Sequence, residues 1–122
     1  MRILALRLSA FASLIAAGYH AAALAVPGFA AITYPPDYPP ARHVVFIVID
    51  GSVAWLLLRR PWWLVRAYVL LTVQVLSGHG RDAWLAWRSA ERVDIVDVGV
   101  SLGVVATLLL LMAEPRPRPP HV

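Results

Sequence analysis

Four apolar runs, separated by polar or proline-rich breaks, dominate the pattern of this sequence. They predict helices over residues of about 4–26, 43–60, 61–78 and 94–113. A membrane-spanning helix needs about 20 residues, with about 17–25 the usual range. The second and third runs reach that range only when their aromatic and histidine edges are included. We therefore expect an all-α fold, an integral membrane four-helix bundle with short loops, as a single transmembrane domain over residues 1–122.

The composition agrees with insertion into a bilayer. Of the 122 residues, 60% are hydrophobic and 15% charged, whereas soluble domains carry about 45–50% apolar and about 25% charged residues. Cysteine, lysine and asparagine are absent. Their absence excludes disulfides, thiolate metal sites and Schiff-base chemistry. The exclusive use of arginine as the basic residue, with no lysine or asparagine, indicates a GC-rich, bacterial genome.

The arginines predict the orientation of the chain. With the N-terminus inside, the inner segments hold the larger group: Arg2, Arg7, Arg59, Arg60, Arg66, Arg116 and Arg118. The outer segments hold Arg42, Arg81, Arg88 and Arg92. This asymmetry predicts both termini in the cytoplasm of a multi-pass protein of the bacterial inner membrane. The net charge of +4 is scattered between apolar runs, so we expect contact with the lipid bilayer and no nucleic acid.

The first run has a second interpretation. Arg2 and Arg7, the apolar stretch that follows and the motif at residues 23–25 also fit a cleavable signal peptide. Cleavage would leave three spans. A retained helix is favoured by the unbroken apolar character and by small residues at every fourth position, at Ser9, Ser13, Ala17, Ala21 and Ala25.

Three polar segments have their own predictions. Residues 34–40, with two Tyr and four Pro, predict a stiff spacer or a docking strip on the outer side. The segment 82–93 places Trp84 and Trp87 three positions apart, which predicts a short helix in the outer interface. Residues 114–122 predict a disordered tail.

Polar residues inside the runs share a depth. One residue of each run lies about 10 Å below its outer edge, at about 1.5 Å per residue: His20, Asp50, Gln74 and Ser101. A shallower access tier holds His43, Ser77, His79, Asp94 and Asp97. An aspartate near mid-membrane costs about 2.5–3.5 kcal/mol. We therefore expect Asp50 to face the bundle interior, with His20 as its partner or in its protonated form.

Three interpretations of this layer stay open. It can be a hydrogen-bonded set that fixes helix register, or a proton or ligand site with His20 and Asp50 as a titratable pair. A metal or haem site using His20, His43, His79 and the carboxylates is the third. No HxxxH or HExxH spacing supports that third interpretation, and no cofactor is predicted.

Two further patterns bear on function. Gly99 and Gly103 form a GxxxG motif, which predicts close packing against another helix or a second subunit. Ser52 and Ser101 lie in apolar runs without an evident oriented base, so we expect no enzyme.

The sequence therefore predicts a small inner-membrane protein of accessory or interaction type, with a buried, outward-facing His/Asp site. Its partner would be another membrane protein or a second copy of the chain. The alternative is a proton-coupled small transporter acting as a homodimer, with Asp50 and His20 as the coupling pair. The inner halves of the runs hold few polar residues beyond Arg66 and Thr107, which favours an outward-facing pocket over a path through the membrane.

Overall fold

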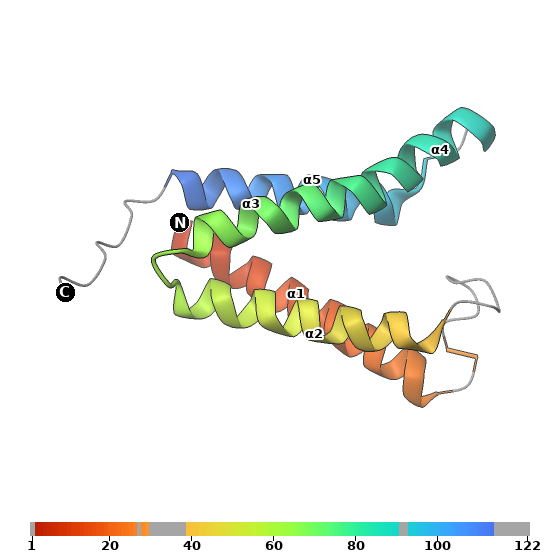
Figure 1. Ribbon diagram of the computed structural model, residues 1–122, viewed down its shortest axis with the longest axis horizontal. Coiled ribbons are helices and arrows are strands. Elements are labelled where there is room, and N and C mark those ends of the chain that lie inside the picture. The colour runs from red at the N-terminus through yellow and green to blue at the C-terminus, as the bar shows by residue number, and fades with distance from the viewer. Residues whose placement is uncertain (1, 27, 30–38, 91–92, 114–122) are drawn as a thin grey trace. The chain divides into compact units, whose positions relative to one another are not determined.

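The computed structural model describes residues 2–26, 28–29, 39–90 and 93–113, and the regular elements of this part are all helices (Figure 1). They are α1 (Arg2–Ala25), α2 (Pro40–Arg59), α3 (Leu64–Val75), the π-helical turn η1 (Leu76–Gly80), α4 (Arg81–Ala90) and α5 (Ile95–Met112). Helices α1, α2 and α5 are long and apolar enough to cross a membrane. This confirms the prediction of an all-α chain with helices of membrane-spanning length.

The third run differs from its prediction. Helix α3 has 12 residues, but η1 and α4 follow it directly, so the chain stays helical from Leu64 to Ala90. The expected break after residue 78 does not occur. Gly-His-Gly at residues 78–80 lowers helix propensity by about 1 kcal/mol for each glycine without forbidding the helix, and it forms a wider π turn instead.

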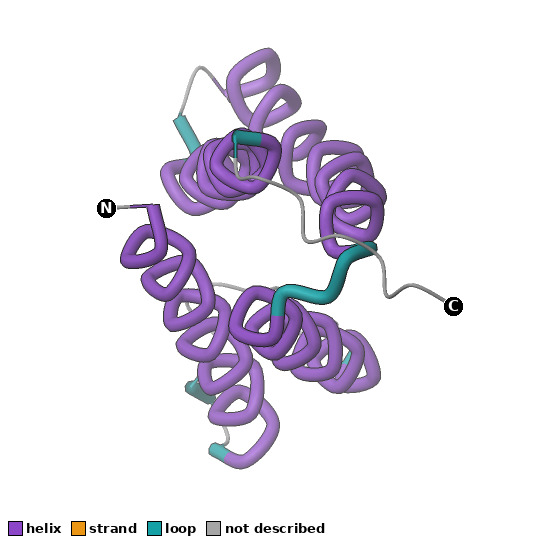
Figure 2. The backbone as a smooth tube through the Cα atoms, turned by 90° about the vertical axis from the view of Figure 1, so that its left-hand side faces the viewer, coloured by secondary structure: helices purple, strands orange, loops and turns teal. Residues whose placement is uncertain are grey.

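The described chain divides into two compact helical units. The first unit contains α1 and α2, which run side by side as a helical hairpin in both ribbon views (Figures 1 and 2). Helix α2 ends at Arg59, because Arg60 takes a left-handed backbone conformation (φ 51°) and Pro61 has no amide hydrogen to continue the helix. In α1, the hydroxyls of Ser9 and Ser13 donate to backbone carbonyls one turn earlier in the same helix.

The second unit contains α3, η1, α4 and α5, with α3 packed along α5. The buried residues of α3 are Leu64, Tyr68 and Thr72, and those of α5 are Val104, Thr107 and Leu111. Their spacing of three to four positions places each set on one helix face. The phenol of Tyr68 is hydrogen-bonded to Thr107, and the Thr107 hydroxyl donates to the carbonyl of Gly103 at 2.9 Å. A polar chain therefore joins two largely apolar helices.

Three predictions concern residues that the structure does not describe. Residues 34–38 of the proline-rich segment and the tail at 114–122 lie outside the described ranges. The same holds for residues 91 and 92 of the interfacial segment. These predictions stay predictions.

Candidate functional site

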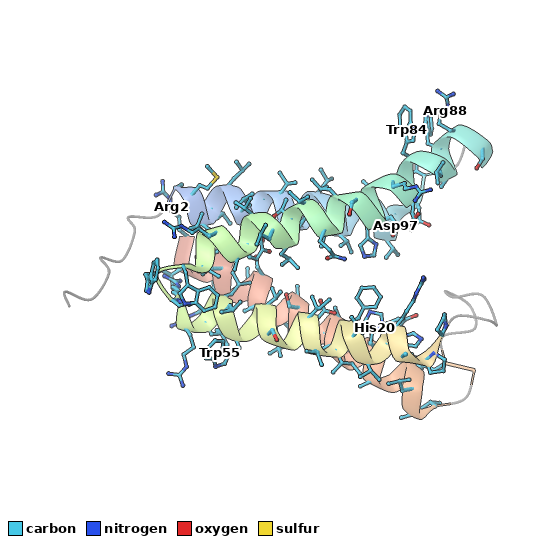
Figure 3. The ribbon with its side chains drawn as sticks, viewed as in Figure 1. Arg2, His20, Trp55, Trp84, Arg88 and Asp97 are labelled. Carbon is cyan, nitrogen blue, oxygen red and sulfur yellow. The ribbon has the colours of Figure 1, made fainter. Side chains whose placement is uncertain are left out.

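A pair of buried histidines is the most distinctive polar feature of the first unit. His20 lies in the last two turns of α1 and His43 in the first turn of α2, with their side chains 8% and 6% exposed. Their Nδ1 atoms are 2.9 Å apart. The ring of Phe46 stacks on His20, with centroids 4.9 Å apart and an interplanar angle of 18°. Figure 3 marks the position of His20 in this hairpin.

The short distance between two ring nitrogens defines the chemistry of the pair. One Nδ1 must carry a hydrogen and donate, and the other must present its lone pair. The donor and acceptor rings therefore differ in tautomer or in charge. The pair holds one proton between two rings and links the two helices at the end of the hairpin that carries residues 26–39.

The structure places His20 beside His43, a pairing that the depth argument did not propose. Counted along the sequence, His20 lies seven positions inward from Pro27, whereas His43 was placed at the outer edge of the second run. The observed helices end and begin elsewhere, at Ala25 and Pro40, which brings the two histidines to one level of the hairpin. Asp50 lies two turns further along α2 and is half-buried.

A second polar pair lies in the second unit. His79 Nδ1 is 2.6 Å from Asp97 Oδ1, and both side chains are partly exposed. His79 belongs to η1 and Asp97 to the first turn of α5, and Figure 3 marks Asp97 at that end of the unit. The contact through Nδ1 fixes the orientation of the imidazole and leaves Nε2 as its second polar atom. Two members of the predicted access tier are therefore brought together.

Asp94, another member of the predicted tier, has a structural task. It is the N-cap of α5, and its Oδ1 accepts hydrogen bonds from the backbone amides of Val96 at 3.1 Å and Asp97 at 3.2 Å. These amides have no partner inside the helix, so the carboxylate stabilises the first turn. The cap holds Asp97 where it meets His79.

Replacing Asp94 by alanine is expected to destabilise the start of α5 by about 0.5–2 kcal/mol, because the two amides lose their acceptor. Hydrogen exchange of the amides of Val96 and Asp97 should become faster in the variant. Asparagine at the same position keeps an oxygen acceptor and is the matched control. Unchanged exchange in the alanine variant would show that the cap contributes nothing.

The remaining members of the predicted layer are less connected. Gln74 is exposed on α3, and the Ser77 hydroxyl donates to its backbone carbonyl. The Oγ of Ser101 is buried and makes no hydrogen bond within the described part of the chain. A serine nucleophile needs a hydrogen-bonded base. Ser101 has no such bond to His79, so the three residues Ser101, His79 and Asp97 do not form a Ser–His–Asp relay in the described structure.

A metal or haem site and close packing at the GxxxG motif were two further predictions from the sequence. Among the described residues, no three His, Asp or Glu side chains gather closely enough to hold a metal ion. Of the three histidines in that interpretation, His20 and His43 are paired in the first unit, whereas His79 lies in the second. Gly99 and Gly103 are exposed, and a Cβ added at either would meet no described atom within 4 Å beyond its own helix.

Tyr68 and Thr107 are functional candidates of a different kind, because they form the hydrogen bond between α3 and α5. In the sequence, Thr107 stands out only as a rare polar residue of the inner half. The signal for Tyr68 is its position one turn after Leu64 and one turn before Thr72, on the face that becomes buried.

Comparison of the chain with known protein families, characterised proteins and solved structures finds no match.

Proposed function

We propose that this chain is a small polytopic inner-membrane protein of accessory or interaction type, whose α1–α2 hairpin is closed by a protonation-dependent histidine pair on the outer side. Both termini would lie in the cytoplasm, and the partner would be a membrane protein or a second copy of the chain. The contact between His20 and His43 is the observation that carries the proposal.

The histidine pair supports a response to pH. Histidine is the side chain whose charge changes between about pH 5 and pH 8. Two protonated rings would place two N–H donors face to face at 2.9 Å, so the closed hairpin binds at most one proton at this contact. The open hairpin can bind two. Acidification therefore favours opening, because the closed state loses stability as the pH is lowered wherever the open state binds more protons.

Within the first unit, α1 and α2 carry further ionisable groups close to the pair in the sequence. Tyr19 precedes His20 on α1, with its ring centroid 5.7 Å from the imidazole. Arg42 precedes His43 on α2, and Asp50 follows two turns later. Arg42 and Asp50 are the charged side chains of α2 that lie nearest to His43 in the sequence.

The polar groups of the second unit favour the accessory class over a transporter. The Thr72 hydroxyl donates to the carbonyl of Tyr68 at 2.8 Å, and Thr107 donates to Gly103. These hydroxyls are engaged in their own helices and in one interhelical bond. A proton path needs groups that exchange partners across the membrane. Asp50, half-buried below the histidines, is the feature that keeps transport as the second candidate.

The proposal is tested by hydrogen exchange of the full chain in lipid nanodiscs at roughly pH 8 and roughly pH 5, corrected for intrinsic exchange rates. We expect the last turns of α1 and the first turns of α2 to lose protection at the lower pH. His20→Gln and His43→Gln should remove this pH dependence, because glutamine does not titrate. His79→Gln is the matched control from the second unit and should leave it intact.

A flux measurement separates the two candidate functions. In proteoliposomes with a pH gradient, the accessory class predicts proton flux no higher than in protein-free liposomes, for the wild type and for Asp50→Ala alike. Wild-type flux that disappears in Asp50→Ala, with unchanged resistance to unfolding, would overturn the proposal in favour of a proton-coupled transporter.

A further inference from the structure

Helix α4 presents a face that no other helix of its unit covers. Trp84 and Leu85 lie three and four positions after Arg81, and Arg88 lies four and three positions after them, so the four residues share one helix face. Trp84 is 58% exposed, and Leu85 and both arginines are exposed as well. The half-buried residues of α4 are Ala83 and Ala86, on the opposite side of the helix. We refer to the first four residues as the Arg–Trp face.

Two members of this face, Trp84 and Arg88, contact each other. The guanidinium carbon of Arg88 lies 5.6 Å from the centroid of the Trp84 ring, which is within the range of a cation–π interaction. Figure 3 shows both side chains projecting from α4. The stacking holds the guanidinium beside an exposed apolar ring, so one site offers a hydrogen-bond fork for an oxyanion and an apolar surface.

The position of α4 in the chain gives the depth of this face. Exposed residues of α3, such as Val69, Leu70 and Val73, are apolar, and η1 joins this apolar stretch to α4 without a break. The first charged residues after it are Arg81 and Asp82. If α3 lies in the hydrocarbon region, α4 begins at the boundary between lipid and water, where tryptophan side chains are enriched.

The sign of the charge selects the ligand. The described part of α4 carries Arg81 and Arg88 against one carboxylate, Asp82. Asp82 is about 100° around the helix from Arg81 and lies off the Arg–Trp face. Arginine binds phosphate oxygens in a bidentate manner, and the adjacent indole fits the level of lipid headgroups.

We propose that the Arg–Trp face of α4 binds the phosphate groups of anionic phospholipids. This interaction is independent of the histidine pair and requires only that the chain lies in a membrane. A zwitterionic headgroup carries an ammonium group that offsets the phosphate charge, so it is the weaker ligand. The surface therefore selects lipids as well as anchoring the end of the second unit.

The test is native mass spectrometry of the full chain with equimolar phosphatidylglycerol and phosphatidylcholine. We expect preferential retention of phosphatidylglycerol. Arg81→Gln with Arg88→Gln should reduce that preference by about fivefold for each arginine. Lysine at both positions should retain most of it. Arg7→Gln with Arg59→Gln makes the same change in charge at exposed arginines elsewhere and is the matched control.

Three results of the lipid comparison would overturn the proposal: equal retention of the two lipids by the wild type, an equal loss in the Arg7/Arg59 control, or an undiminished preference in the Arg81/Arg88 variant. Inorganic phosphate is added as a competitor. If it displaces phosphatidylglycerol fully at equimolar concentration, the face is a general oxyanion site and not a lipid surface. Helical circular dichroism of each variant verifies that the comparison is made between folded proteins.

Discussion

Replacing His20 by alanine is expected to lower the free energy of unfolding of the α1–α2 hairpin by about 2–4 kcal/mol. The substitution removes an aromatic ring that is 8% exposed and stacked on Phe46. It also leaves the buried Nδ1 of His43 without the nitrogen that lies 2.9 Å away. The measurement is the rate of unfolding of the full chain in mixed micelles, or amide exchange along α1 and α2 in nanodiscs.

A double-mutant cycle isolates the contact between the two rings. We expect His20→Ala, His43→Ala and the double variant to give a coupling energy of about 1 kcal/mol. His79→Ala, in the second unit, should leave exchange in the hairpin unchanged. Strictly additive effects of the two substitutions would mean that the rings contribute packing alone, and the protonation-dependent closure would lose its basis.

Replacing Tyr68 by alanine is expected to destabilise the packing of α3 on α5 by about 3–5 kcal/mol, because a large buried ring is removed. Tyr68→Phe keeps the ring and loses only the hydrogen bond to Thr107. Interhelical hydrogen bonds in membranes contribute about 0.6 kcal/mol on average and at most about 1.7, so the phenylalanine variant should lie in that range. Amide exchange in α3 and α5 measures both.

One result of the comparison between the two Tyr68 variants would contradict this prediction. If phenylalanine costs as much as alanine, the hydroxyl and not the ring holds the unit together. Thr107→Val tests the same bond from the other helix and removes the donor to Gly103 as well. Its effect should be only partly additive with that of Tyr68→Phe, because both variants remove the hydrogen bond between Tyr68 and Thr107, and Thr107→Val removes the bond to Gly103 in addition.

The apolar runs predicted the helices because length and hydrophobicity decide whether a segment can span a bilayer. The ends were harder to predict. Helix α2 begins at Pro40, earlier than expected, because proline fits the first turn of a helix, where its missing amide hydrogen costs nothing. Gly78 and Gly80 predict an end to the third helix, yet the chain stays helical through them.

The histidines and carboxylates of the candidate site were singled out from the sequence, but neither of its two observed pairs was predicted. His79 and Asp97 were placed in one tier, and the structure joins them. The contact of His20 with His43 was missed because the outer edges of the first two runs were read from the sequence, at Pro27 and at His43, and not from the helix ends. The depth of a residue along a helix does not give the direction of its side chain around the helix axis. Depth alone therefore could not show which polar side chains at the same depth face each other.

The π turn at η1 has a consequence for the direction of the side chains beyond it. Each residue rotates an α-helix by about 100°, and a π turn holds one residue more than an α turn would. The angular phase of α4 relative to the buried face of α3 is therefore set by the number of residues in Leu76–Gly80. The direction in which Trp84 and Arg88 point is determined by that number, although neither residue belongs to the turn.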